Sequence, residues 1–211
     1  MMETAIVAFT TFFATIAPLD VAAMFAALTP NATAVEKRSM AIRGTMISGA
    51  ILLSFALVGE IVLSTLGISL AALKVAGGIL LLLIGIEMVF ARSSGGTSTT
   101  DEEDQEAIAS KDIAVFPLAT PLIAGPGAMG ATILLMADAR GDLVAEAIII
   151  GAMLTVLLLT LALLLLTNKV LRLFGITAMY VISRVFGVLL SALAVQFIFD
   201  GLAQSGLLGK N

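Results

Sequence analysis

The sequence predicts an all-α polytopic membrane protein whose six transmembrane helices form two inverted three-helix repeats. Composition is the first observation: of 211 residues, 60% are hydrophobic and 12% are charged, which is about half the charged share of a soluble domain. The second is a series of apolar runs of spanning length. The third is a partial repeat between the two halves, in each of which Pro or Gly breaks the first helix.

Each apolar run is long enough to cross a bilayer, which takes about 20 mostly apolar residues. The start of the chain, Met1-Met2-Glu3, lacks the basic residues of a signal peptide. The first span is therefore expected to belong to the mature structure. The expected spans lie near residues 5–29, 43–66, 70–91, 112–137, 143–167 and 176–200.

The predicted organisation is a first repeat at 1–91, a loop at 92–111 and a second repeat at 112–211. The loop reads RSSGGTSTTDEEDQEAIASK, in which Gly, Ser, Thr and acids dominate. Such a segment cannot bury a core and is expected to be flexible. A solvated linker explains this composition; a regulatory or partner-binding patch is the alternative.

Lys and Arg predict the orientation in the membrane. They concentrate in the odd-numbered loops, at Lys37, Arg38 and Arg43, at Arg92 and Lys111, and at Lys169 and Arg172. The opposite segments hold only Lys74, Arg140 and Lys210. We therefore expect a bacterial or archaeal inner (plasma) membrane protein with both termini outside and the acidic loop in the cytoplasm.

Charge and composition exclude several classes of function. The net charge of −4 argues against nucleic acid as a partner. The chain has no Cys and no His, which excludes disulfides, Cys nucleophiles, Ser-His-Asp triads and zinc sites built from those ligands. We expect no cofactor and no resident metal. The expected partners are the lipid bilayer and a small molecule.

The repeat is seen by comparing LGISLAALKVAGGILLLLIGIEMVF, from Leu66, with FGITAMYVISRVFGVLLSALAVQFIF, from Phe174. Gly-Ile-Ser in the first corresponds to Gly-Ile-Thr in the second. Ala-Pro-Leu-Asp at 17–20 likewise corresponds to Thr-Pro-Leu-Ile at 120–123. A repeat of three spans reverses the direction of its second copy, a plan common among secondary transporters.

Breaks in the first span of each repeat predict a binding site. Span one contains Pro18, and span four contains Pro117, Pro121, Gly125, Pro126 and Gly127. Non-helical backbone at membrane depth is tolerated only against protein or a water-filled cavity. We expect helices to restart near Asp20, as an N-cap, and near Pro126. Their N-termini would meet and bind a small anion or carboxylate; the alternative is a pair of simple kinks.

Several polar side chains join this prediction. Asp20 either caps its half-helix or binds a substrate ammonium or a coupling proton, since an acid inside a membrane is a functional candidate. Thr15 and Thr120 supply hydroxyls. The full candidate substrate site is Thr15, Pro18, Asp20, Thr120, Pro121, Gly125, Pro126 and Gly127.

Four further charges are predicted to be buried within the bundle. Glu60 and Lys74 lie toward the outer side and are expected to pair, as are Glu87 and Arg184 toward the inner side. Lys74, Gly78 and Gly85 share one face, and Arg184, Gly187, Ser191 and Ala194 form a similar stripe. Small residues allow helices to approach closely, so these stripes permit homo-oligomers without requiring them.

The sequence resembles the MarC family, also called the small neutral amino acid transporter family. The matching motifs are Phe116-Pro-Leu-Ala-Thr-Pro-Leu-Ile-Ala-Gly-Pro-Gly127, LGISLAALKVAGGILLLLIGIE from Leu66 to Glu87, Glu36-Lys-Arg38, and Ala-Leu-Val-Gly-Glu at 56–60. The resemblance covers nearly the whole chain and implies a six-span inner-membrane protein. Members usually carry a polar residue before the first Pro of span one, and a second Pro five residues later. Here Ala17 and Ala23 stand at those positions, and Asp20 replaces a Gly.

We expect a secondary transporter of a small solute, with small neutral amino acids such as alanine or glycine as substrates and a proton or sodium ion for coupling. The alternatives are a channel, a carrier of another metabolite or lipid head group, or a membrane protein without transport. A two-aspartate protease using Asp20 and Asp200 is disfavoured, because no Gly-x-Gly-Asp pattern surrounds either acid. No enzyme activity is expected.

Overall fold

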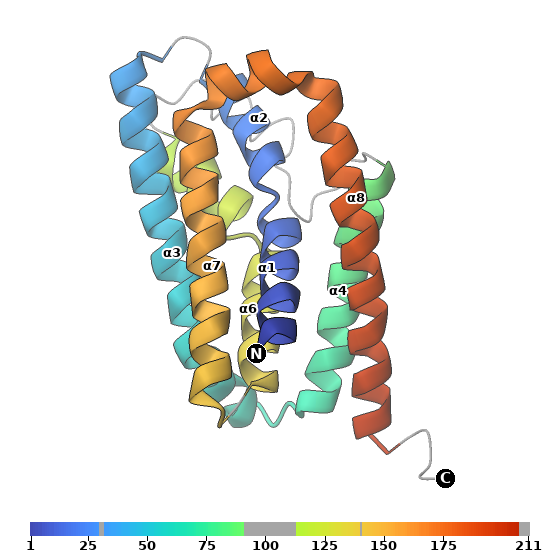
Figure 1. The fold of residues 1–211 in the computed structure, drawn as a ribbon. Helices are drawn as coiled ribbons and strands as arrows, with labels where there is room; N and C mark the ends of the chain where they lie inside the picture. The colour runs from blue at the N-terminus through green and yellow to red at the C-terminus, as the bar shows by residue number, and fades with distance from the viewer. Residues whose placement is uncertain (30–31, 91–112, 140, 207–211) are drawn as a thin grey trace.

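The computed structural model is a bundle of helices, without strands in the parts of the chain that it describes (Figure 1). It describes residues 1–29, 32–90, 113–139 and 141–206; the side chains at 60, 62, 64, 168–180 and 183 lie outside this description. The predicted acidic loop at 92–111 also lies outside it. The elements are α1 (Met2–Ile16), α2 (Pro18–Leu28), α3 (Ala34–Thr65), α4 (Leu70–Phe90), η1 (Ala114–Ile123), α6 (Pro126–Asp138), α7 (Leu143–Leu165) and α8 (Thr167–Gln204).

The candidate membrane spans agree with the sequence in number and approximate place. Five stretches are long and apolar enough to cross a membrane: Met2–Leu28, Ala34–Gly59, Leu70–Phe90, Leu143–Leu165 and Arg184–Gln204. A sixth is formed if η1 and α6, which meet at an angle of 53°, count as one broken span. Successive spans run in opposite directions, so the fourth runs opposite to the first (Figure 1).

Two predicted boundaries were wrong. Lys37 and Arg38 belong to α3 and not to a loop, because Thr33 and Glu36 start this helix early. The Thr33 backbone N–H donates to Glu36 Oε2 at 2.8 Å, and the Glu36 N–H donates to Thr33 Oγ1 at 3.3 Å, which is a capping box. At the other end of the chain, α8 begins at Thr167 and not near 176. Its first part lies across the end of the bundle before the helix turns alongside α4 (Figure 1).

The glycine stripes hold α4 and α8 together within one chain. A Cβ atom at Gly85 would lie 2.3 Å from Ser191 Oγ and 2.9 Å from the Gly187 carbonyl oxygen, and one at Gly78 would lie 2.7 Å from the Ala194 carbonyl oxygen. The prediction that these stripes allow close helix approach is confirmed. Because the stripes face each other, they are not surfaces left over for a second copy.

The core of the bundle is formed by the two broken spans and the helices around them. Phe12 and Phe25, from α1 and α2, and Ile123 and Leu134, from η1 and α6, are almost fully buried. α7 contacts both α1 and α2, while α3 contacts both η1 and α6. Most of the interrupted backbone therefore lies inside the protein, where it is sheltered from lipid, although Phe116 and Pro126 are exposed.

Candidate functional site

The first break lies at Ala17, between α1 and α2. Ala17 has φ 48° and ψ 62°, in the left-handed region, and it is the only described non-glycine residue with a positive φ. Its N–H donates to the Phe13 carbonyl and its own carbonyl accepts from Val21, both at 3.0 Å. The chain thus ends one helix and starts the next at a single residue, with Pro18 at the first helical position.

The prediction that Asp20 is the N-cap was wrong, because the N-cap of α2 lies three residues earlier, at Ala17. Ala17 occupies the cap position, and Asp20 lies in the first turn of α2. A carboxylate there faces the positive end of the helix dipole. Asp20 is half-buried.

The second break is longer and spans η1. Phe116 and Thr120 have extended backbone angles inside it, and the Phe116-Pro117 and Thr120-Pro121 bonds are cis. Wide turns occur at both ends of this segment: the Leu118 N–H donates to the Ile113 carbonyl at 3.1 Å and the Ala124 N–H donates to the Ala119 carbonyl at 2.9 Å, each five residues back. Prolines lack the N–H that a regular helix needs here, so the chain closes its turns around them.

α3 supports this irregular backbone. Ser48 Oγ, fully buried, donates to the Gly44 carbonyl at 2.8 Å and lies 3.4 Å from the Ala119 carbonyl oxygen. A Cβ atom on Gly44 would lie 2.6 Å from Leu118 Cδ2 and 3.1 Å from the Ala114 carbonyl oxygen. The lack of a side chain at Gly44 therefore lets α3 approach η1 closely.

The helix restart near Pro126 is confirmed. Gly125 is the N-cap of α6, with Pro126 at the first helical position, and the Met129 N–H donates to the Gly125 carbonyl at 3.0 Å. The N–H groups of Gly127 and Ala128 precede this first bond, so they have no acceptor within the helix. A Cβ atom on Gly125 would lie 2.5 Å from the Pro121 carbonyl oxygen, so only glycine fits there.

The two breaks lie against each other. A Cβ atom on Gly127 would lie 4.0 Å from Cβ of Thr15, two residues before the break in span one. α1 contacts α6, and α2 contacts η1. Of the eight predicted site residues, Thr15, Pro18, Gly125 and Gly127 are buried, Asp20, Thr120 and Pro121 are half-buried, and Pro126 is exposed.

Some hydroxyl groups near the breaks form hydrogen bonds, and others do not form one with a described residue. Thr15 Oγ1 donates to the Thr11 carbonyl at 2.8 Å. Thr11, one turn earlier and fully buried, has a hydroxyl without a hydrogen-bond partner among the described residues, as does Thr45 on α3. The sequence does not single out Thr11 or Thr45, because threonine is common in membrane helices and its burial depends on neighbouring helices.

The buried charges are arranged differently from the prediction. Lys74 is buried, but its partner is Asp138, at the end of α6; the Glu60 side chain lies outside the described residues. Glu87 is half-buried. Arg184 is exposed, and it forms no ion pair with a described residue, Glu87 included. The prediction that Arg184 is buried was wrong, because the neighbouring helices leave its side chain uncovered.

These features define an integral membrane protein whose core is built on two interrupted helices. The sequence pattern of the MarC family of integral membrane proteins matches residues 2–205. The chain therefore belongs to this family. A UPF0056 membrane protein of Methanocaldococcus jannaschii is 39% identical over 93% of this chain and 95% of its own length. One from Archaeoglobus fulgidus is 34% identical over 93% and 91%, and YvbG of Bacillus subtilis is 33% identical over 92% of both chains. No solved structure matches the chain.

Proposed function

We propose that this MarC family protein is a secondary transporter of a small solute, built from two inverted three-helix repeats. The observation that carries the proposal is the contact between the two broken spans at the centre of the bundle. Broken helices at the centre of a membrane bundle are the usual place for substrate and coupling ions in such transporters.

The helix contacts support the inverted repeat. If α1, α2, α3 and α4 correspond to η1, α6, α7 and α8, contacts should occur in matching pairs. The contact of α1 with α7 corresponds to that of η1 with α3, and the contact of α2 with α7 corresponds to that of α6 with α3. Likewise, α2 contacts α8 as α6 contacts α4. The contacts of α1 with α8 and with α4 have no counterpart of similar extent and depart from this pattern.

The start of α6 suits a carboxylate. The N–H groups of Gly127 and Ala128 lack helical acceptors, and the positive end of the helix dipole lies beside them. Backbone amides at a helix N-terminus bind anions without a basic side chain. Substrate binding there would use Gly125 to keep the backbone approachable, with Thr15 and Thr120 as neighbouring hydroxyl groups.

The start of α2 suits the opposite charge. Asp20 lies in its first turn and is half-buried. In the proposal it takes the substrate ammonium or a coupling proton or sodium ion. An ammonium and a carboxylate recognised together select a zwitterion, so we propose small neutral amino acids of the alanine and glycine type. The transporter would carry out no chemical reaction, and both termini would lie outside the plasma membrane.

Uptake of labelled alanine into proteoliposomes tests the proposal. The purified chain should accumulate alanine under an imposed proton or sodium gradient, with saturation at rising concentration. Gly125→Ala should abolish uptake, since its Cβ would meet the Pro121 carbonyl. Absence of gradient-dependent uptake across a panel of amino acids would remove this substrate class. Steady conductance in a planar bilayer would instead indicate a channel.

A further inference from the structure

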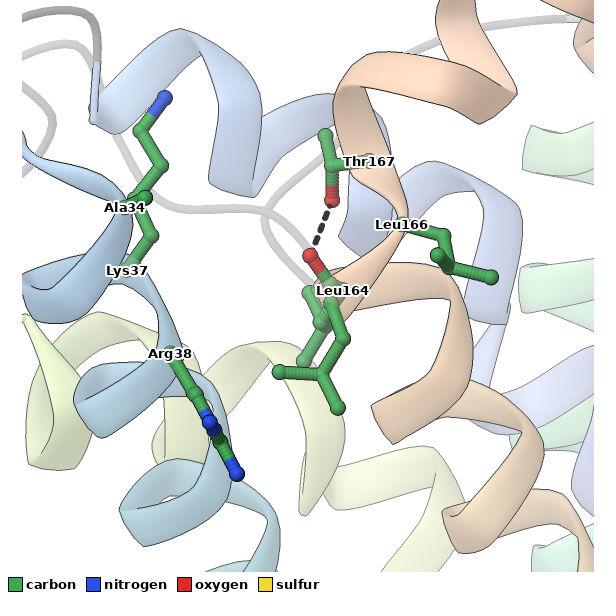
Figure 2. A pocket seen from close by; sticks show the side chains of 7 residues that line it. Ala34, Lys37, Arg38, Leu164, Leu166 and Thr167 are labelled. Carbon is green, nitrogen blue, oxygen red and sulfur yellow. Dashed lines mark hydrogen bonds between the residues drawn. The ribbon is translucent and has the colours of Figure 1, made fainter.

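A groove of about 430 Å³ opens at the end of the bundle, away from the helix breaks. It lies between the start of α3 and the junction of α7 with α8 (Figure 2). One wall is formed by leucines and the other by basic residues. The lining residues are Ala34, Lys37, Arg38, Leu164, Leu165, Leu166 and Thr167.

The charge of the groove is of one sign. Two lining residues are cationic and none is acidic. Among the described residues, neither Lys37 nor Arg38 forms an ion pair. Glu36, the adjacent acid, accepts hydrogen bonds from Thr33 in the capping box. The two basic side chains extend from α3 in opposite directions (Figure 2), so positive charge borders the groove along its length.

The other wall places the groove at the edge of the apolar layer. The apolar span of α7 ends at Leu165, and Leu165 and Leu166 are 45% and 46% exposed. The Thr167 hydroxyl donates to the Leu164 carbonyl at 2.7 Å (Figure 2). This bond satisfies one of the carbonyls that carry the negative end of the α7 dipole. Exposed apolar surface here adjoins two basic side chains that form no ion pair with a described residue.

We propose that this groove binds the head group of an anionic phospholipid. The phosphate lies in the positive field of Lys37 and Arg38, and Leu165 and Leu166 contact the part of the acyl chains next to the head group. Basic pockets between membrane helices at the cytoplasmic side are suited to anionic head groups. The concentration of Lys and Arg in and beside the odd-numbered loops predicts that this end of the bundle faces the cytoplasm.

Native mass spectrometry of the purified full chain, titrated with phosphatidylglycerol or with phosphatidylcholine of the same acyl chains, tests the proposal. Phosphatidylglycerol should be retained preferentially. Replacing both Lys37→Gln and Arg38→Gln should weaken its binding by about tenfold or more, given the usual contribution of each basic residue near an anionic surface. Arg184→Gln, which removes an exposed positive charge outside the groove, is the control for loss of positive charge and should leave retention unchanged.

Two further measurements distinguish a phospholipid site from loss of folding and from a site for free phosphate. Ala34→Glu places an acid in the groove at an exposed first-turn position, where a carboxylate favours the helix, and it should also prevent retention. It replaces the double variant if that variant does not fold. Equal retention of both lipids, or unchanged retention in Ala34→Glu, would overturn the proposal. Displacement of phosphatidylglycerol by millimolar inorganic phosphate would also overturn it, by indicating a site for a free anion.

Discussion

At the scale of single residues, Lys74 shows how a charge is held inside an apolar bundle. Its side chain is 4% exposed and pairs with Asp138, whose side chain is 48% exposed. Gly201 on α8 lies against the Lys74 stem, since a Cβ atom there would be 3.0 Å from Cβ of Lys74. A buried ammonium is costly unless it is paired, so the pair joins α4 to the end of α6.

Asp138→Asn should therefore lower the thermal stability of the purified protein. Loss of the carboxylate leaves the buried ammonium of Lys74 without its counter-charge. We expect a cost of about 2 kcal/mol, less than for a fully enclosed pair because Asp138 meets solvent. The double variant Lys74→Met with Asp138→Asn should regain most of it. Equal unfolding temperatures for Asp138→Asn and the unmodified chain would show that the pair contributes nothing.

Asp20 is the residue on which the proposed function makes its sharpest prediction. Asp20→Asn keeps the size of the side chain but removes its charge, so gradient-driven alanine uptake should fall at least about tenfold, the effect of 1.4 kcal/mol. Asp200→Asn is the control, because Asp200 accepts a hydrogen bond from Gln196 within α8 at 2.9 Å and lies outside the proposed site. Uptake in proteoliposomes with matched protein content is the measurement. Full activity of Asp20→Asn would show that its charge is dispensable.

At the scale of elements, glycine decides how closely helices approach. α4 and α8 meet through Gly78, Gly85 and Gly187, where added side chains would collide with backbone or with Ser191. Close approach gives dispersion contacts, which replace the hydrophobic driving force that is missing between helices in lipid.

Gly85→Ala should destabilise the bundle by about 1–3 kcal/mol, the usual cost of overpacking. Its new methyl group would collide with Ser191 Oγ and approach the Gly187 carbonyl oxygen. Gly151→Ala on α7 is the matched control, because no atom lies within 4 Å of its added Cβ; there the stability should stay the same or rise slightly. Thermal unfolding in detergent measures both, and equal behaviour of the two variants would contradict the packing described for α4 and α8.

The broken elements show how far an element can be predicted from its own residues. The density of Pro and Gly from 117 to 127 predicted the break and the restart at Pro126 correctly. In span one, the good capping chemistry of Asp20 led to an N-cap assignment that was wrong. Pro18 already suits the first helical position, and Ala17 accepts the left-handed conformation that ends α1.

At the scale of the whole molecule, the directions of the spans support the proposed inverted repeat. α3 and α7 run in opposite directions, as do α4 and α8 (Figure 1). The beginning of α1 and the end of α8 lie toward the same end of the bundle, as an even number of crossings requires (Figure 1).

Cysteine labelling tests this arrangement cleanly, since the chain has no native cysteine. Val35→Cys, at the start of α3, should be protected from a membrane-impermeant maleimide in intact cells and react after lysis. Ser69→Cys, before α4, and Leu143→Cys, at the start of α7, should react in intact cells; all three positions are exposed. Labelling of Val35→Cys together with Ser69→Cys from outside would contradict the path of the chain, and the reverse pattern would invert the predicted orientation.

The sequence alone determined the membrane class, the approximate spans and the positions of the two breaks, because apolar length and proline chemistry act locally along the chain. Only the tertiary structure decided which helices meet. It paired Lys74 with Asp138, placed Arg184 at the surface, and brought Thr15 against Gly127. These outcomes depend on contacts between residues far apart in sequence, and such contacts are set by the packing of whole helices, which no local pattern encodes.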